Sequence, residues 1–289
     1  MTFDFETIID RRGKDAVAVD APAVQMSGGF FPETKVQEEF SIIPMWVADM
    51  NFQTAPAVAQ AIRSRADHHL YGYFLPPSQY FQSIINWQKE RNGVTDLKPE
   101  HIGYENGVLG GVVSALRILC SNGDPVLVQT PTYVGFTHSL EDNGWKSVLN
   151  PLKRDAEGIW RMDYEDMERK IIENHVHAAI FCSPHNPSGR VWQAWEIEKA
   201  MEIFARHDVY VIADEIWSDL TLPGYHHIPT QSVSEDARNR TIALYSPSKA
   251  FNLAGLVGSY HIVYNAYLRD RIRREATMTH YNHMNVLSM

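Results

Sequence analysis

The sequence predicts an α/β fold in which helices cover both faces of a mostly parallel β-sheet. Short apolar runs typical of strands alternate with longer segments of helical periodicity from residue 125 to residue 280. The runs are continuous rather than alternating, as in "PVLVQ" and "VYVIAD", which indicates strands that are buried on both faces. Hydrophobic residues form 44% of the 289-residue chain, which is normal for a protein with a substantial core.

The first regular elements are two helices that precede the alternating region. Residues 1–45 carry little periodicity and are expected to form an arm. The pattern over 56–68 predicts a helix with Pro56 in its first turn. A second helix is predicted over 78–93, with Ser78 as its N-cap and Gly93 as its stop.

Strands and helices then follow one another along the rest of the chain. A glycine-rich start opens the first of these helices, and Asp163 is a candidate N-cap for a later one. The predicted helices are 106–124, 133–144, 162–173, 194–208 and 266–280. The predicted strands are 125–129, 145–152, 177–183, 209–214, 241–245 and 259–265.

Ligands of such sheets bind at the carboxyl ends of the strands, so the residues there carry the functional prediction. "TPTY", "SPHN", "DEIW" and "SPSK" follow four of the strands and bring Tyr133, Asn186, Asp214 and Lys249 toward one crevice. The segment "NGVLGG" at the start of helix 106–124 adds backbone N–H groups at the positive end of a helix dipole, which suits a phosphate.

Pyridoxal phosphate fits these groups better than a nucleotide does. Neither GxGxxG nor GxxxxGK[ST] occurs, and these are the patterns expected for nucleotide binding. Pyridoxal phosphate needs a lysine amine, a carboxylate opposite its ring nitrogen, an anion cradle and a flat partner for its ring. The candidates for these tasks, with donors to the ring oxygen and the phosphate included, are Lys249, Asp214, Tyr133, Asn186, Ser246 and Ser248.

Five ordered blocks of sequence resemble one enzyme family. They are "PMWVADMNF", "YGYF", "SPHNPSGRVW", "ADEIWSDL" and "SPSKAFNLAGL", and together they cover most of the chain. They resemble the fold-type I pyridoxal-phosphate enzymes of the aminotransferase class I/II superfamily. The resemblance is greatest to the MalY/PatB group of cystathionine β-lyase-like C–S lyases.

The resemblance implies a role for each residue around the cofactor ring. Lys249 would form the Schiff base and act as the catalytic base, and Asp214 would hold the pyridine nitrogen protonated. Asn186 would bond the phenolic oxygen and Tyr133 would stack on the ring. Trp217 stands where the lyases often have His and the aminotransferases Tyr, so contacts around the ring oxygen are expected to differ.

The resemblance also implies how the phosphate is held. Val108 and Leu109 would donate backbone N–H groups, helped by the hydroxyls of Ser246 and Ser248. Tyr73, in "YGYF", would reach the phosphate of the other subunit, so a homodimer with a shared active site is expected.

The domain organisation follows from the same resemblance. It implies the aspartate aminotransferase-like fold of pyridoxal-phosphate-dependent transferases. Residues 1–50 would form an arm and part of a small domain, with the loop 46–48 over the substrate, and residues 51–289 would form the large cofactor-binding domain. The family's C-terminal small domain supplies the arginine for the substrate carboxylate. We expect that domain to be absent from these 289 residues.

The expected reaction is the α,β-elimination of cystathionine or related S-substituted cysteines, which gives a thiol, pyruvate and ammonia. Val257 stands where many aminotransferases have arginine, which favours the lyase group. The alternatives are an aminotransferase of amino acids and a non-catalytic regulatory member of the family. A nicotinamide-dependent dehydrogenase ranks last because its glycine fingerprint does not occur.

Each candidate residue also has a purely structural interpretation. Lys249 could be a surface lysine, Asp214 a helix cap and Asn186 part of an Asn-Pro turn. Packing of an aromatic ring would explain Tyr133 or Tyr73. A simple turn would account for the two serines, Ser246 and Ser248.

Composition limits the possible partners and location. A net charge of −9 without a Lys/Arg-rich block argues against a nucleic-acid partner. The sequence contains no apolar run of about 18 residues, the length expected of a membrane-spanning helix. Cys120 and Cys182 lie in apolar stretches, which favours reduced thiols and a cytoplasmic protein without a signal peptide. The pairs His68–His69 and His226–His227 lack zinc-site spacing, so we expect no metal.

Overall fold

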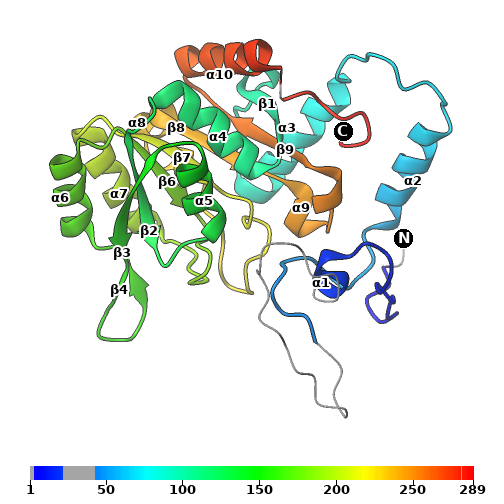
Figure 1. Cartoon of the computed structure of the whole chain (residues 1–289), viewed down its shortest axis with the longest axis horizontal. Helices are drawn as coiled ribbons and strands as arrows, with labels where there is room; N and C mark the ends of the chain where they lie inside the picture. Colours follow the sequence, from blue (N-terminus) through cyan, green and yellow to red (C-terminus); the bar gives the residue numbers. More distant parts are fainter. Residues whose placement is uncertain (1–2, 22–42, 281) are drawn as a thin grey trace. The chain divides into compact units, whose positions relative to one another are not determined.

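The computed structural model describes residues 3–21, 43–280 and 282–289 (Figure 1). The chain forms two compact units, Met1–His69 and Leu70–Met289. The first unit contains helices α1 (Val17–Asp20) and α2 (Pro56–Ala66). The expected division into an arm of residues 1–50 and a large domain stays a prediction.

The second unit is built around one mixed β-sheet. In the described part of this unit, seven strands lie in the order β1-β9-β8-β7-β6-β2-β3. Neighbouring pairs from β8 to β3 are parallel, whereas β9 is antiparallel to both β8 and β1. Six strands therefore point one way and β9 points the other. This arrangement confirms the predicted mostly parallel sheet.

The strands and helices of the second unit have the following bounds. The sheet strands are β1 (Ile102–Asn106), β2 (Pro125–Thr130), β3 (Lys146–Pro151), β6 (Ala178–Cys182), β7 (Tyr210–Asp214), β8 (Thr241–Tyr245) and β9 (Gly258–Ile262), and β4 (Lys153–Arg154) pairs with β5 (Trp160–Arg161). The helices are α3 (Ser78–Asn92), α4 (Val108–Leu119), α5 (Val134–Asp142), α6 (Tyr164–Asn174), α7 (Ala194–Arg206), α8 (Glu235–Arg240), α9 (Pro247–Ala250) and α10 (Ala266–Thr279).

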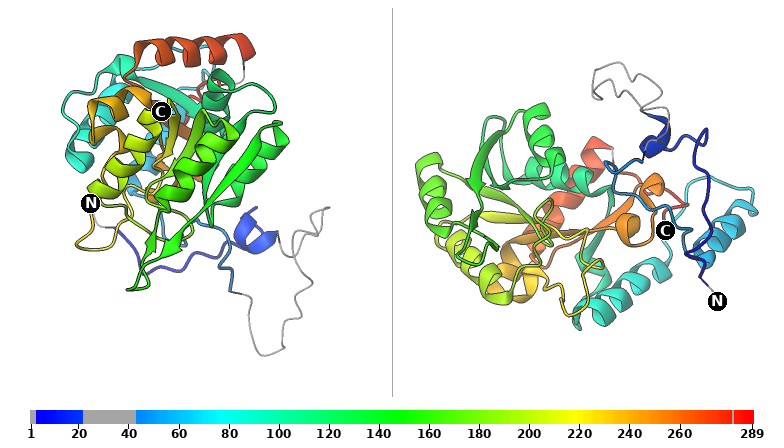
Figure 2. Two further views of the ribbon diagram at one scale, coloured as in Figure 1. Left: turned by 90° about the vertical axis from the view of Figure 1, so that its left-hand side faces the viewer. Right: turned by 90° about the horizontal axis from the view of Figure 1, so that it is seen from below.

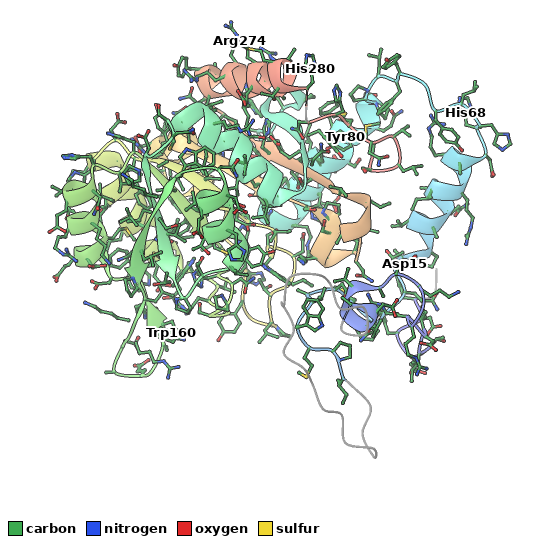
Figure 3. All side chains as sticks on the ribbon, in the orientation of Figure 1. Asp15, His68, Tyr80, Trp160, Arg274 and His280 are labelled. Atoms are coloured by element: carbon green, nitrogen blue, oxygen red, sulfur yellow. The ribbon has the colours of Figure 1, made fainter. Side chains whose placement is uncertain are left out.

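Helices cover both faces of this sheet, as Figure 2 shows from two sides. Alternate residues of each strand point to opposite faces, so the core divides into layers. One layer joins Val128, Ile180 and Ile212 to α4, α5 and α10. On the other face the strands pack against α6, α7 and α8 in one cluster and against α3 in another. The outer side of α10 carries Arg274, which points away from the sheet (Figure 3).

The element boundaries correct several expectations. The segment "IGYEN" is a strand, β1, that the sequence did not predict, and Asn106 belongs to it rather than to the following helix. That helix begins at Val108 and ends at Leu119. Pro77, not Ser78, is the N-cap of α3, whereas the left-handed C-cap at Gly93 is confirmed. Asp163 is also confirmed as the N-cap of α6, where its carboxylate accepts from the Asp166 N–H.

Membrane-spanning helices and metal-binding clusters are both absent from the described residues. No helix there is both long and apolar enough to cross a membrane. No group of three or more His, Cys, Asp or Glu side chains there could hold a metal ion.

A substitution in β1 tests the close packing of this strand against β9. Gly103 pairs with His261, and a Cβ added at Gly103 would lie 2.2 Å from two atoms of the imidazole ring. His261 cannot move freely because its Nδ1 lies 2.7 Å from the Glu105 carboxylate. We expect Gly103→Ala to lower the free energy of unfolding by about 1–3 kcal/mol. Denaturant titration beside Gly255→Ala, where nothing lies within 4 Å, would measure the loss; equal stability of the two variants would refute this packing.

Candidate active site

Four adjacent parallel strands end at one edge of the sheet, and the predicted site residues follow them. The strands are β8, β7, β6 and β2, in that spatial order. Lys249 comes after β8, Asp214 ends β7, Asn186 comes after β6, and Tyr133 comes after β2. The parallel topology therefore places these residues at the same edge, although their chemical roles stay predictions.

Asp214 is a buried carboxyl group at the centre of this edge. Only 5% of the residue is exposed, and its Oδ1 accepts a hydrogen bond from the Ile216 N–H at 3.1 Å. The pKa of Asp214 is raised to about 7, mainly because the carboxyl group is buried. The hydrogen bond from the Ile216 N–H lowers this pKa, the negative charge of Glu215 raises it, and the positive charge of Lys249 lowers it. A cationic ring nitrogen beside this carboxylate would relieve the cost of its burial.

This raised pKa predicts how the cofactor-free protein responds to pH. Folded Asp214 holds its proton up to about pH 7, whereas unfolded Asp releases it near 3.8, so the folded state binds more protons between these values. Stability contributed by Asp214 is therefore lost as the pH rises from about 4 to about 7, on the order of a few kcal/mol. Asp214→Asn should remove this loss. Unfolding midpoints measured across this range would contradict the assignment if both proteins lost stability equally.

Lys249 lies on the short helix α9, directly after the end of β8. Its Nζ lies 5.5 Å from the centre of the Trp217 ring. Its positive charge lowers the pKa of Asp214, which places the two groups within electrostatic reach. The amine, the carboxyl group and the indole thus belong to one site.

Two serine hydroxyls flank the start of α9. Ser246 is the N-cap, and its Oγ accepts from the Ser248 N–H at 3.1 Å. The two Oγ atoms are 2.6 Å apart, and the Ser246 hydroxyl also lies 2.7 Å from the Gly258 carbonyl oxygen. These contacts agree with the interpretation of both serines as turn residues. The Ser246–Ser248 hydroxyl contact is only part-buried, so a ligand could also reach it.

The amino end of α4 lies beside the same edge, because β1 has the direction of the parallel strands and leads into it. Gly107 caps this helix with a φ of 76°, and no side chain caps it. Val108 and Leu109 are the next residues, so their N–H groups lie in the first turn, where a helix binds anions.

Tyr133 and Leu109 meet at Gly135. A Cβ at Gly135 would lie 2.4 Å from the Tyr133 ring and 2.9 Å from the Leu109 side chain. The Tyr133 ring packs edge-on against Phe136 at 5.5 Å and stays 39% exposed. An aromatic face thus lies next to the start of α4.

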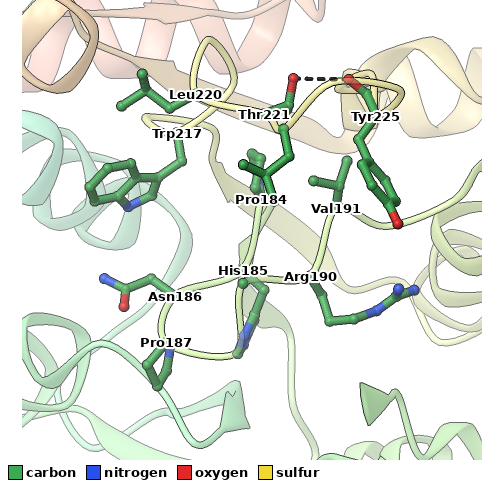
Figure 4. Close-up of a pocket in the computed structure, with 12 residues that line it drawn as sticks. Pro184, His185, Asn186, Pro187, Arg190, Val191, Trp217, Leu220, Thr221 and Tyr225 are labelled. Atoms are coloured by element: carbon green, nitrogen blue, oxygen red, sulfur yellow. Dashed lines mark hydrogen bonds between the residues drawn. The ribbon is translucent and has the colours of Figure 1, made fainter. Parts of the chain in front are cut away.

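A cavity of about 410 Å³ opens beside Asn186 and Trp217 (Figure 4). Its wall is formed by the turn after β6 and by the segment that follows β7. The close-up shows Asn186 and Trp217 near each other on one side, with Arg190 and Tyr225 on the other. The cavity gives a small molecule access to the amide and the indole.

Tyr73 does not join these residues within the chain. Its side chain is fully exposed, and Leu70, Tyr71 and Leu75 beside it are exposed too. The loop 46–48 belongs to the first unit, so its expected place over the substrate stays a prediction.

Sequence reasoning missed a buried polar network behind the site. Glu215 is fully buried and lies 2.7 Å from the Nε2 of His227, which belongs to one of the two histidine pairs that lack zinc-site spacing. The only local signal was the second carboxylate in "ADEIW", directly after Asp214.

The donor set at this edge suits pyridoxal phosphate. It combines a primary amine, a buried carboxyl group, an exposed aromatic face, an amide and an uncapped helix start with two hydroxyls. Each of these matches one part of the cofactor: the aldehyde, the ring nitrogen, the ring, the phenolic oxygen and the phosphate. A nucleotide has no group that would match both the amine of Lys249 and the buried carboxyl group of Asp214.

Comparisons with known proteins agree on one family. Residues 42–283 match the family described as aminotransferase class I and II. The chain is 38% identical over 232 residues to cystathionine beta-lyase PatB of Bacillus subtilis, which covers 80% of this chain and 58% of that protein. It is 29% identical over 269 residues to protein MalY of Escherichia coli, which covers 93% of this chain and 65% of that protein.

A solved structure supports the same fold. The pyridoxal-phosphate-bound C–S lyase of Staphylococcus hominis superposes with a TM-score of 0.86 at 32% identity, over 100% of this chain and 69% of that one. The chain spans less than two thirds of the length of the two curated relatives. The expected resemblance to the MalY/PatB group and the expected fold are confirmed.

Proposed function

This chain belongs to the aminotransferase class I and II family, and we propose from that premise that it is a pyridoxal-phosphate-dependent C–S lyase. The observation that carries the proposal is the buried carboxyl group of Asp214 within electrostatic reach of Lys249, at the carboxyl edge of a parallel sheet. The proposed substrate is cystathionine or another S-substituted cysteine. Water and the substrate give a thiol, pyruvate and ammonia.

The proposed holding of the cofactor uses the residues at this edge. Lys249 would hold it through its amine, Asp214 would face the ring nitrogen, and Asn186 would face the phenolic oxygen. Tyr133 would supply the stacking face, and Trp217 would line the ring's other edge. The groups for the phosphate would be the first N–H groups of α4, at Val108 and Leu109, and the hydroxyls of Ser246 and Ser248.

When bound, pyridoxal phosphate supplies an electron-withdrawing ring for the electron pair left at the substrate Cα. The chain's own groups do the rest. Lys249 Nζ, once it is freed from the cofactor by the substrate amine, would take the proton from Cα as a general base. Asp214 would stay ionised beside the cationic ring nitrogen and so keep a proton there.

A lyase is favoured over an aminotransferase by two observations. The relative PatB is named a cystathionine beta-lyase, and the Staphylococcus hominis structure is that of a C–S lyase. Val257 also lacks the guanidinium that many aminotransferases carry at this place. Transamination remains the second candidate because the family name includes it.

We further propose a homodimer whose subunits share their sites. The exposed aromatic and aliphatic side chains of Leu70, Tyr71, Tyr73 and Leu75 support it, because such a patch favours burial against another protein surface. A cytoplasmic location is proposed from the free thiols of Cys120 and Cys182.

Product analysis tests the proposed reaction. The purified protein, supplied with pyridoxal phosphate and cystathionine, should release thiol and pyruvate in equal amounts. Formation of a keto acid without free thiol would show that the reaction is transamination and not elimination. Neither product, from protein that binds the cofactor, would favour the non-catalytic alternative.

A further inference from the structure

A second buried carboxylate, Glu215, lies directly behind Asp214 and has no part in the chemistry above. Neither the residue nor its partner His227 is more than 8% exposed. Three donors occupy the two oxygens of this carboxylate. Oε2 lies 2.7 Å from His227 Nε2 and accepts from the Tyr245 hydroxyl, and Oε1 accepts from the Thr230 N–H at 2.8 Å.

These contacts join the ends of the two strands that lead to Asp214 and Lys249. Glu215 follows Asp214 at the end of β7, and its N–H donates to the Leu244 carbonyl of β8 at 2.9 Å. Tyr245 is the last residue of β8, directly before the segment that carries Lys249. The carboxylate of Glu215 therefore links β7 to β8 just where both strands enter the site.

The same carboxylate also fixes one end of the cavity wall. The segment from Trp217 to Tyr225 lines the cavity, and it continues into His227 and Thr230, which both bond Glu215. A stacked ring holds the network from the other side. Tyr260 lies 5.5 Å from Tyr245 with nearly parallel planes, and its hydroxyl accepts from Gln88 Nε2 of α3 at 2.9 Å.

The Glu215 carboxylate is costly to bury, and both of its oxygens are hydrogen-bonded, whereas His227 Nδ1 and Thr230 Oγ1 behind it are buried without a hydrogen-bond partner. Burial alone would raise the pKa of Glu215, but His227, Tyr245 and the Thr230 N–H lower it on balance, so the carboxylate stays ionised. Apolar residues of similar volume often give equal stability at such places, whereas a hydrogen-bonded carboxylate fixes one arrangement of the donors around it.

We propose that Glu215, His227 and Tyr245 are positioning residues that hold Asp214, Lys249 and the cavity wall in register for the cofactor. The inference rests on the proposed function, because it concerns the binding of pyridoxal phosphate at that site. Removing one donor should loosen the end of β8 against β7 while leaving the core in place. The affinity for the cofactor should fall about 10-fold or more, the scale on which the loss of residues behind metal ligands lowers metal affinity.

Two conservative variants in the full chain test this inference. Tyr245→Phe removes one donor and keeps the ring, and Glu215→Gln removes the charge and keeps the shape. Pyridoxal phosphate is titrated into each cofactor-free protein, the unfolding midpoint is measured, and the absorption of the bound cofactor is followed against pH. The matched control is Glu168→Gln, which changes a similar Glu–His pair at 2.8 Å on the surface between α6 and α7.

We expect both variants to bind pyridoxal phosphate about 10-fold more weakly and to shift the pH at which its absorption changes. The unfolding midpoint of Tyr245→Phe should stay near that of the parent, and Glu168→Gln should match the parent in all three measurements. Parental affinity and parental pH behaviour of Tyr245→Phe would overturn the inference, and so would a change confined to its unfolding midpoint.

The parent protein separates this inference from the proposed function. A parent that shows no cofactor band depending on Lys249 would refute the function itself. If the parent binds the cofactor and Tyr245→Phe behaves like it, only the positioning network fails. Should Glu215→Gln not fold, Tyr245→Phe and His227→Gln give the result.

Discussion

Replacing Lys249 with alanine should abolish turnover and the visible absorption of the bound cofactor together. Lys249 lies within electrostatic reach of Asp214 and 5.5 Å from the centre of the Trp217 ring, at the edge where four parallel strands end. It is both the proposed covalent anchor and the proposed base at Cα. We expect kcat/KM for cystathionine to fall by about 10²–10⁴-fold or more.

The control for this change is Lys199→Ala on α7. Lys199 Nζ lies over the Tyr164 ring of α6, and neither α6 nor α7 contributes a residue to the candidate site. Its loss should leave the absorption band and turnover unchanged. A Lys249→Ala protein that retained either the band or the activity of the parent would show that another group anchors the cofactor.

Asp214→Asn should have the second largest effect. Asparagine has nearly the same shape, but it cannot carry the charge that keeps a proton on the ring nitrogen, so the ring withdraws electrons less well. We expect kcat to fall by about 10²–10³-fold, as when a group stabilising the transition state is lost. The cofactor should still bind through Lys249, so its absorption should persist in a shifted form.

A remote carboxylate controls for the loss of charge. Asp166 on α6 bonds Lys170 and Asn150 of β3, which lies three strands away from β7 in the sheet, so Asp166→Asn should keep its kcat. If Asp214→Asn turned over at the rate of the parent, the buried carboxyl group would have only a structural role.

Much of the fold and of the candidate site could be predicted because the signals are local. Every residue of β6 and β8 is buried, as is every residue of β7 except Tyr210, and mainly apolar runs of this kind are indicated well by a continuous hydrophobic segment. Once their direction is known, the rule for parallel sheets gathers the residues after them at one edge. Asp214 and Lys249 could therefore be selected before any contact was known.

The parts that were missed depend on contacts between distant segments. Strand β1 escaped prediction because Glu105 interrupts its apolar pattern, yet this carboxylate is fully buried. Its oxygens bond Ser114, His261 and Asn282, and two of these partners lie more than 150 positions away. Glu215 behaves in the same way through His227 and Tyr245. In a sequence, a charged residue indicates an exposed loop, because the partners that would satisfy it in a buried position are not known.

The most direct test of the account is the position of the covalent link. The protein is loaded with pyridoxal phosphate, reduced with borohydride and digested, and the modified peptide is located by mass spectrometry. The account predicts that the peptide containing "SPSKAFNLAGL" carries the cofactor on Lys249, at about one per chain. Modification spread over surface lysines, or none at Lys249, would contradict it.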